Sequence, residues 1–296
     1  SVAPSDGIYR ISVKRDGRVS QFLHDRIAVG DVFEVRAPAG DFSIDARSTR
    51  PAVLLAGGVG ITPLLAMLRH IVYEGLRKQR VRPVTLFYAA RSKADRPFDK
   101  EIADLIGATK GGVRLVRVLS DTTDAKEGRD YDAAGRIDMA MLTRFLPFND
   151  YDFYLCGPAQ FTQELYDGLR AFNIADDRIQ AEAFGPSSLI RTGLAAPAMI
   201  SPAAQPSDKP VPVIFTISLK EARWTLGSGT LLEFAEARGL EPEFSCREGN
   251  CGTCRTKLEK GAVAYVKQPT AKIGADEVLL CCAVPAEQEG GLQLAV

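Results

Sequence analysis

Five cysteines near the end of the chain are the residues whose types and spacing are best suited to chemistry. Cys246, Cys251 and Cys254 lie in the stretch CREGNCGTC, separated by four and then two residues, and Cys281 and Cys282 follow far downstream. Three cysteines at these intervals with a distant fourth show the plant-type spacing of [2Fe-2S] ligands. Because four thiolates must converge on two irons, the spacing predicts an iron–sulfur site in this part of the chain.

The loop between these cysteines is built from small residues. Ser245, Gly249, Gly252 and Thr253 surround the three closely spaced cysteines. A cluster with negative charge needs backbone N–H groups close to its sulfurs, and bulky side chains would block them. We therefore expect this loop to direct backbone N–H groups at the cysteine sulfurs.

The fourth ligand is one of two neighbours. If residues 278–281 form a strand, adjacent side chains point to opposite faces, so only one of Cys281 and Cys282 faces the cluster. Zinc and disulfides are the alternatives. Structural zinc sites usually show two closely spaced ligand pairs, whereas three cysteines and one are found here. Disulfides need an oxidising compartment, and nothing at the N-terminus resembles a secretion signal.

Length and composition indicate a soluble globular protein. The 296 residues suggest two or three domains, with 46% hydrophobic and 25% charged residues. Lys plus Arg and Asp plus Glu are both 37, so no net field favours nucleic acid or anionic lipid. No apolar run reaches the length of a membrane span. With His24 and His70 alone, a histidine-rich metal site is excluded, and the single thiols Cys156 and Cys282 fit a cytoplasmic location.

The middle of the chain alternates between strand and helix patterns. Strands are expected near 52–56, 84–90, 113–119, 151–156 and 178–184. Helices are expected near 63–78, 98–107, 138–146 and 159–172. Such alternation predicts a parallel sheet covered on both faces, a doubly wound nucleotide-binding domain over residues 48–185.

The two ends of the chain follow other patterns. Residues 1–47 predict short strands, among them 10–13 and 31–35, which are too few to close a barrel, and because the chain begins with Ser1 we expect a fragment. Residues 186–210 are rich in Ala, Pro and Ser and predict a linker. Residues 211–296 predict a half-buried strand, then a helix opened by the capping box of Thr230 and Glu233 and ending at Arg238, and a last strand at 292–296.

A glycine-rich turn joins the first strand of the middle segment to a helix. Glycines let a backbone approach a pyrophosphate, and the start of a helix presents free N–H groups and a positive dipole end. In this turn Thr62 is expected to cap the helix and Pro63 to suit its first turn. The candidate phosphate-binding residues are Gly57, Gly58, Val59, Gly60, Ile61, Thr62 and Pro63. A tight strand-to-helix turn that binds nothing needs glycines as well.

Two further loops follow strands of the same predicted sheet. Cys156, Gly157 and Pro158 end the fourth strand, and Arg91 and Ser92 follow the second. Ligands of open parallel sheets lie outside the carboxyl ends of the strands, so these loops are expected beside the glycine turn, with Arg91 and Ser92 near a ribose or a 2′-phosphate. For Cys156 the alternative is a small buried thiol, and for Arg91 a solvated loop.

These motifs together resemble the ferredoxin-NADP reductase superfamily, in domain order its phthalate dioxygenase reductase-like members. The resemblance rests on GGVGITP, CGP, the strand end Glu182-Ala183-Phe184 and the C-terminal plant-type ferredoxin motif. It implies that the glycine loop and the Cys-Gly-Pro loop bind NADH or NADPH. It also implies that Cys156, Glu182 and Phe184 shape the nicotinamide and flavin pocket, with no certain catalytic acid or base. It also assigns Cys281 as the fourth ligand, because Pro285 follows it by four residues as in plant-type ferredoxins, and leaves Cys282 as a packed thiol.

The resemblance also interprets the first segment. Residues 1–47 look like the later part of a flavin-binding barrel, in which Gly17, Val19 and Ser20 would approach the phosphate of FAD or FMN. The earlier Arg-x-Tyr-Ser/Thr motif of the family is absent from the sequence. The implied fold class is multidomain α/β plus β: a partial flavin-binding β-barrel, a doubly wound parallel-sheet NAD(P)-binding domain and a C-terminal β-grasp ferredoxin domain.

The implied activity is electron transfer. A hydride carries two electrons from NAD(P)H, a [2Fe-2S] cluster accepts one at a time, and a flavin between them does both. The expected acceptor is a protein such as an oxygenase, and neither nucleic acid nor membrane is expected as a partner. Two alternatives stay open: the reductase tail of a larger self-sufficient enzyme with a fused catalytic domain, and a ferredoxin-like carrier that does not oxidise NADH.

Overall fold

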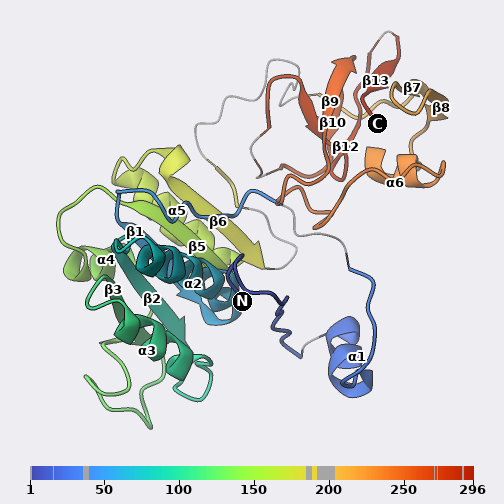
Figure 1. Ribbon diagram of the computed structural model, residues 1–296. Coiled ribbons are helices and arrows are strands. Elements are labelled where there is room, and N and C mark those ends of the chain that lie inside the picture. Colours follow the sequence, from blue (N-terminus) through green and yellow to red (C-terminus); the bar gives the residue numbers. More distant parts are fainter. Residues whose placement is uncertain are drawn as a thin grey trace. The chain divides into compact units, whose positions relative to one another are not determined.

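The structure is a computed structural model that describes residues 2–15, 17–35, 40–184, 189–191, 204–269, 271, 273–288 and 290–296. Contacts divide the chain into two compact units. The first comprises Ser1–Ala37 and Ser43–Gly185, and the second comprises Pro38–Phe42 and Pro186–Val296. Each unit has its own sheet (Figure 1).

The first unit is built on a six-stranded parallel sheet in the order β4-β3-β2-β1-β5-β6. Its strands are β1 (Ala52–Gly57), β2 (Val84–Ala90), β3 (Val113–Leu119), β4 (Ala133–Ala134), β5 (Asp152–Pro158) and β6 (Ile179–Phe184). All six residues of β1 are buried, as expected of a central parallel strand covered on both faces. From β1 the chain moves outward through β2 and β3 and returns to β5 on the other side, so the strand order reverses between β1 and β5.

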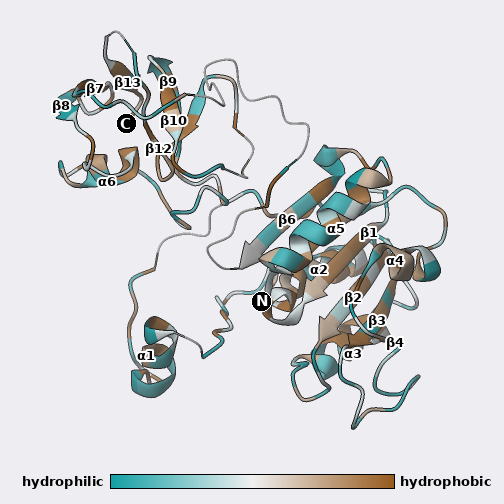
Figure 2. Ribbon diagram, turned by 180° about the vertical axis from the view of Figure 1, so that it is seen from behind, coloured by the Kyte–Doolittle hydropathy of each residue, from teal (hydrophilic) through white to brown (hydrophobic). Residues whose placement is uncertain are grey.

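Helices cover both faces of this sheet, as the alternation predicts. They are α2 (Ile61–Arg77), α3 (Asp99–Ala108), α4 (Met139–Phe145) and α5 (Ala159–Ala171), with short 3₁₀ turns η1 (Gly58–Gly60) and η2 (Asp176–Arg178). The crossovers through α2 and α3 run in the opposite direction to that through α5, and right-handed crossovers in opposite directions lie on opposite faces. Figure 1 shows α2 and α3 in front of the sheet, and Figure 2, seen from behind, shows α5 with a hydrophilic outer face over hydrophobic strands.

The N-terminal segment differs from the prediction. The described part of residues 2–47 contains the helix α1 (Arg18–Arg26) and no strand, so the strands expected at 10–13 and 31–35 are wrong. A strand is stabilised by the partner strand it pairs with, whereas a helix forms its hydrogen bonds locally. Here the N–H of Gly17 donates to Oγ of Ser20 at 2.8 Å and the N–H of Gln21 donates to the carbonyl of Gly17 at 2.9 Å, which starts the helix.

The second unit has a five-stranded mixed sheet in the order β11-β9-β13-β7-β8 and a separate pair, β10 with β12. The strands are β7 (Val211–Phe215), β8 (Lys220–Trp224), β9 (Arg255–Lys260), β10 (Val263–Tyr265), β11 (Glu277–Leu279), β12 (Ala283–Pro285) and β13 (Leu292–Leu294). The pair β13 and β7 is parallel, and the other pairs are antiparallel. This sheet with one helix is the arrangement expected of a ferredoxin domain.

The helix found in the described part of this unit, α6 (Leu231–Glu236), begins as predicted. The N–H of Glu233 donates to Oγ1 of Thr230 at 3.3 Å, and the N–H of Thr230 donates to Oε2 of Glu233 at 2.8 Å. This capping box satisfies two N–H groups that a helix start leaves without partners. It fixes the entry to α6, whose Phe234 packs with Phe215 in the core.

Candidate functional site

The second unit brings the four predicted ligands together from two segments. Cys246, Cys251 and Cys254 occupy the loop between α6 and β9, and Cys281 lies in the turn between β11 and β12. Their sulfurs come together as two pairs, Cys246 with Cys251 and Cys254 with Cys281, whose members shift each other's pKa. The charge of Cys251 also raises the pKa of Cys254, so the two pairs lie near each other.

Backbone N–H groups of the loop are aimed at these sulfurs, as the small residues predict. The N–H groups of Glu248, Asn250 and Cys251 each lie 3.4 Å from Sγ of Cys246. The N–H of Gly249 lies 3.3 Å from Sγ of Cys281. Donors in this arrangement stabilise negative charge on sulfur, which is what a thiolate-bound cluster requires.

The four thiols lie close enough to shift one another's pKa values. The Cys246 thiol donates to the sulfur of Cys251 and lowers the pKa of Cys251 to about 4, while the same bond raises the pKa of Cys246. A bond to Cys281 and burial raise the pKa of Cys254. The four thiols therefore cannot all ionise unless a positive charge lies among them, and two irons supply that charge.

A buried hydroxyl near these sulfurs also fits an iron–sulfur cluster. Oγ1 of Thr253 is buried and forms no hydrogen bond of ordinary geometry with the residues that the structure describes. It lies beside Cys251, where the Cys246 thiol and then the Thr253 hydroxyl lower the pKa of the Cys251 sulfur. A hydroxyl in this position is a donor to a bound thiolate, so this donor set fits a [2Fe-2S] cluster.

The pairing of the sulfurs bears on the zinc alternative. Within the described ranges, no three side chains of His, Cys, Asp or Glu converge on a position for one metal ion. A structural zinc needs four ligands around a single ion, whereas each iron of a two-iron cluster takes two protein ligands. Two pairs of cysteines match the requirement of a two-iron cluster.

Cys281 and Cys282 are not part of a strand, so the expected alternation of their side chains is wrong. The N–H of Cys282 donates to the carbonyl of Leu279 at 3.3 Å, which closes a turn between β11 and β12. Both side chains are buried. Of the two sulfurs, that of Cys281 accepts the N–H of Gly249, so Cys281 stays the predicted fourth ligand.

In the first unit, the glycine turn and the Cys-Gly-Pro loop lie against each other at the point where the strand order reverses. Gly57 ends β1, and a Cβ atom on it would lie 3.2 Å from both Pro158 and Phe161. Gly157 is equally close, since its Cβ would lie 3.2 Å from Cα of Gly57. The glycines are required because two backbones approach closely here.

The residues after the glycines form the start of α2. The backbone of Val59 lies in η1 and Ile61 begins α2, with Pro63 in the first turn as predicted. The expected cap is wrong: Oγ1 of Thr62 donates to the carbonyl of Val59 at 3.0 Å, because Thr62 already lies inside the first turn, and the N-cap residue is Gly60. The start of this helix still offers its positive dipole end to an anion.

A pocket of about 320 Å³ opens beside the glycine turn, at the carboxyl ends of the strands. Arg91 lines it as predicted, but Ser92 does not, since its hydroxyl donates to Asp95 at 2.7 Å. Arg136 adds a second guanidinium. Lining residues that the motifs did not indicate are Ala89, Ala90, Ser120, Gly135, Arg136, Ile137, Gln160, Phe161 and Glu164. Arg136 follows the two-residue strand β4, and only the position of β4 at the sheet edge would have revealed it.

The three residues assigned to the nicotinamide and flavin pocket lie at the ends of β5 and β6. Cys156 is directly opposite Glu182 in the sheet, and Pro158 is opposite Phe184. Burial, and after it the charge of Glu182, raises the pKa of the Cys156 thiol. Cys156 is 0% exposed and does not line the pocket beside the glycine turn, as the alternative of a small buried thiol predicts. The side chain of Phe184 lies outside what the structure describes.

The candidate flavin residues are found elsewhere. Gly17 precedes α1, and Val19 and Ser20 belong to its first turn. Among the described residues, these three are not part of the pocket beside the glycine turn. Their assignment to a flavin phosphate stays a prediction.

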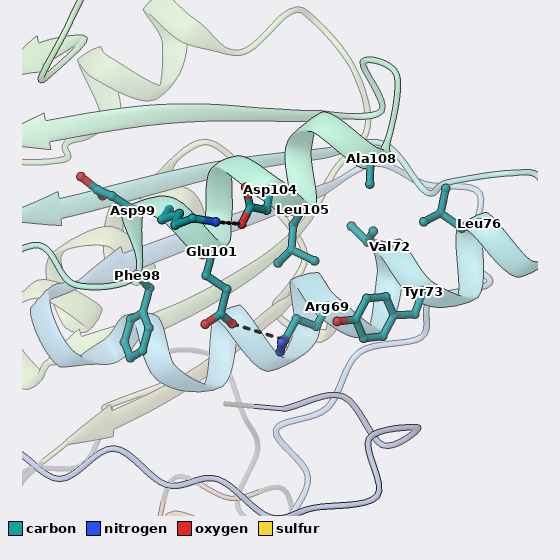
Figure 3. A pocket seen from close by; sticks show the side chains of 11 residues that line it. Arg69, Val72, Tyr73, Leu76, Phe98, Asp99, Glu101, Asp104, Leu105 and Ala108 are labelled. Atoms are coloured by element: carbon teal, nitrogen blue, oxygen red, sulfur yellow. Dashed lines mark hydrogen bonds and ion pairs between the residues drawn. The ribbon is translucent and has the colours of Figure 1, made fainter.

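A larger pocket, of about 600 Å³, lies between α2 and α3. Figure 3 shows Glu101 of α3 reaching Arg69 of α2, and the two groups are 3.3 Å apart. Arg10 adds a second ion pair to Glu101 at 2.9 Å. This pocket is lined by α2 from Arg69 onward and by α3, and by no residue of the glycine turn, so its greater size does not indicate the reactive site.

No helix within the described residues combines the length and the apolar character needed to cross a bilayer.

Comparisons with known proteins agree with both sites. Residues 54–166 match the family model of the oxidoreductase NAD-binding domain, and residues 220–286 match that of the 2Fe-2S iron–sulfur cluster binding domain. The flavohemoprotein of Oceanobacillus iheyensis is 40% identical over 192 residues, which are 63% of this chain and 45% of that protein. The flavohemoprotein of Bordetella pertussis is 38% identical over 185 residues, again 45% of its length. The chain thus spans about half the length of these curated relatives.

Two solved structures share the fold over nearly the whole chain. Phthalate dioxygenase reductase is 22% identical with a TM-score of 0.50, and the match covers 96% of this chain and 78% of that one. An intact type IV self-sufficient cytochrome P450 monooxygenase is 23% identical with a TM-score of 0.64, and the match covers 96% of this chain and 32% of that one. Residues that match an oxidoreductase NAD-binding domain are thus followed by residues that match a 2Fe-2S iron–sulfur cluster binding domain, and the chain shares its fold with both solved structures.

Proposed function

We propose that this chain passes electrons from NAD(P)H through a flavin to a [2Fe-2S] cluster and on to an oxygenase-type protein. One observation carries the proposal: a single chain holds a pocket beside a glycine turn and a cysteine loop whose N–H groups are aimed at sulfur. NAD(P)H supplies a hydride, a flavin accepts both of its electrons, and a [2Fe-2S] cluster carries them singly. A donor site and a one-electron site in one chain are the two ends of such a route.

In the first unit the protein binds and orients. The glycine turn and the start of α2 provide close backbone approach and a positive dipole end for the pyrophosphate, and Arg91 and Arg136 add positive charge at the pocket. Cys156 and Glu182, side by side at the strand ends, shape the nicotinamide end of the site. Hydride transfer needs no protein acid or base, so positioning is the contribution of these residues.

The proposal of a bound flavin is supported more by the relatives than by the described residues. The flavohemoproteins match 60–63% of this chain, and their name marks them as flavin proteins. We assign Gly17, Val19 and Ser20 to the flavin phosphate and Phe184 to the flavin ring. FAD and FMN are both compatible with these residues.

The acceptor follows from the proteins that share the fold. Phthalate dioxygenase reductase serves a dioxygenase by its name, and the self-sufficient P450 monooxygenase carries its reductase within one chain. Both are systems that activate oxygen. The proposed acceptor is therefore an oxygenase, either as a separate protein or as a fused catalytic domain.

Visible absorbance and low-temperature EPR of the anaerobic protein test the proposal. The expected result is a reduced [2Fe-2S] signal after dithionite, and the same signal after NADH once FAD or FMN is bound. Cys254→Ala, which removes one of the four paired thiols, is the control that loses the signal. Iron-containing protein without a [2Fe-2S] signal after dithionite would contradict the cluster, and a flavin-loaded protein that NADH cannot reduce would contradict the route.

A further inference from the structure

Two sulfur atoms meet the same glycine of the cysteine loop. The N–H of Gly249 donates to Sγ of Cys281 at 3.3 Å. A Cβ atom on Gly249 would lie 3.0 Å from Sγ of Cys282. Both sulfurs therefore reach the loop that surrounds the cluster site, although the proposed function uses one of them.

The turn between β11 and β12 explains how the adjacent side chains of Cys281 and Cys282 point toward the same loop. In a strand they would point to opposite faces, but Cys281 and Cys282 belong to the turn that Leu279 closes. Their side chains are 7% and 1% exposed, and their thiols are within hydrogen-bonding reach of each other. Cys281 and Cys282 thus direct two buried sulfurs toward the cysteine loop at Gly249.

Backbone contacts place this turn at the cluster site. The N–H of Leu280 donates to the carbonyl of Cys254 at 3.2 Å, and the N–H of Gly249 donates to Sγ of Cys281. Cys282, the next residue, is therefore near the pair formed by Cys254 and Cys281. Its S–H donates to the carbonyl of Leu279 over 3.7 Å, a long contact that is easily given up.

We propose that Cys282 is an alternative ligand for the iron held by Cys254 and Cys281. In the exchange, the bond from iron to Sγ of Cys281 breaks, a bond to Sγ of Cys282 forms, and the proton of the Cys282 thiol passes to the sulfur of Cys281. Adjacent Cα atoms are about 3.8 Å apart, so a side-chain rotation and a shift of the turn are sufficient. The inference rests on the proposed function, since it requires the [2Fe-2S] cluster.

Four variants of the full chain test this exchange after anaerobic reconstitution with iron and sulfide. Cys281→Ala is expected to keep at least half of the wild-type iron, with altered EPR g-values and visible circular dichroism. Cys281→Ala/Cys282→Ala is expected to keep none. Cys254→Ala, which has no neighbouring cysteine in the sequence, is the matched control and is expected to lose the cluster. Cys282→Ala is expected to keep the wild-type spectrum.

Two outcomes overturn the inference. One is a Cys281→Ala protein that is folded by far-UV circular dichroism and buried-tryptophan fluorescence but binds no cluster. The other is loss of the cluster in Cys282→Ala, which would make Cys282 the native ligand. A wild-type protein that forms no cluster contradicts the proposed function instead, so the two failures are distinguishable.

Cys281→Ser gives a second route if the alanine variant does not fold. Serine is nearly isosteric with cysteine and offers an oxygen ligand. If Cys282 replaces Cys281, the EPR spectrum of Cys281→Ser differs from that of Cys281→Ser/Cys282→Ala, in which the serine oxygen is the remaining ligand at that position. Identical spectra of these two variants overturn the inference.

Discussion

A Cβ atom on Gly60 would lie 2.0 Å from the carbonyl oxygen of Cys156. Gly60 ends the 3₁₀ turn after β1, and Cys156 belongs to β5. The turn and the strand therefore pack backbone against backbone, at the point where the strand order reverses. This contact sets the position of the glycine turn and of the first turn of α2, to which the proposed function assigns dinucleotide binding.

Gly60→Ala is expected to weaken NADH binding strongly. The added methyl group must displace backbone on one side, which costs about 1–3 kcal/mol and moves the turn that approaches the phosphates. We expect the Kd for NADH, measured by fluorescence titration, to rise at least tenfold.

Gly107→Ala is the matched control for this variant. Gly107 lies in α3 and its Cβ would meet nothing within 4 Å, so the variant should bind as wild type. Equal affinity of Gly60→Ala and wild type would show that the turn does not bind the dinucleotide.

Thr253→Val is expected to make the cluster harder to reduce. The Thr253 hydroxyl lies beside the sulfur of Cys251, and a donor to sulfur stabilises the additional negative charge of the reduced state. A hydrogen bond of roughly 1 kcal/mol corresponds to about 40 mV for one electron, so the midpoint potential should fall by that order.

The serine variant separates the hydroxyl from the shape of the side chain. Thr253→Ser keeps the donor and should keep the potential, as measured by EPR-monitored redox titration. A shift in Thr253→Ser that equals the shift in Thr253→Val would show that packing, and not the donor, sets the potential.

The strands and helices of the first sheet could be predicted because their signal is local. The apolar run 52–56 is as expected of a central strand, and the helix patterns end within one or two residues of the observed helices. The cysteine spacing was equally informative, because the ligands of a cluster are fixed by the loop that connects them. Thr230 and Glu233 identified a helix start through a contact between residues three apart.

The errors concern features that depend on distant parts of the chain. Residues 10–13 and 31–35 form no strand, because a strand needs a partner and the described part of this segment provides none. Cys281 and Cys282 share a side because β11 and β12 turn between different sheets, which the alternation of one segment does not indicate. Arg136 reaches the pocket because β4 adds to the sheet edge beside β3.

Arg136→Gln is expected to raise the Kd for NADH and NADPH about tenfold. The guanidinium lines the pocket at the strand ends, and a charge-assisted contact to phosphate is worth roughly 1.5–3 kcal/mol. The loss should shrink at high salt, because screening weakens such contacts in the wild type. A larger loss for NADPH than for NADH would assign the residue to the 2′-phosphate.

Lys78→Gln is the control for this charge. Lys78 follows the opposite end of α2 and is exposed. Removing its charge changes the net charge equally but should leave both affinities unchanged. A similar loss in the two variants would mean that the overall field, and not a contact of Arg136, attracts the dinucleotide.

Asp130→Asn is expected to destabilise the first unit in a pH-dependent way. The carboxylate accepts from Lys93 at 2.8 Å, from Arg129 at 2.8 Å and from the N–H of Lys126 at 3.0 Å. Arg129, Lys93 and then Lys126 hold the pKa of Asp130 below its usual range. A lowered pKa stabilises the fold fully above the unfolded value of about 4, and the effect is lost as the pH falls below it.

The difference in urea midpoint between wild type and Asp130→Asn should therefore be largest at pH 7 and shrink below about pH 4. Far-UV circular dichroism on iron-free protein measures it, because cluster binding itself depends on pH. Asp104→Asn is the control, since Asp104 is 65% exposed in its ion pair with Lys100. A difference that does not change with pH would exclude ionisation as its cause.

Removal of iron is expected to loosen the second unit and leave the first unchanged. Without irons, the paired thiols of Cys246 and Cys251 and of Cys254 and Cys281 retain protons or repel one another, so the loop loses the charge that holds it together. Trp224, the single tryptophan, is 2% exposed in this core and donates its indole N–H to Gly229 at 2.9 Å. Its fluorescence therefore reports the second unit alone.

After chelation we expect the urea midpoint followed by Trp224 to fall and to recover on reconstitution. The affinity for NADH should be unchanged, because the residues lining that pocket belong to the first unit. An unchanged midpoint would show that the loop is stable without metal and would contradict a structural role for the cluster.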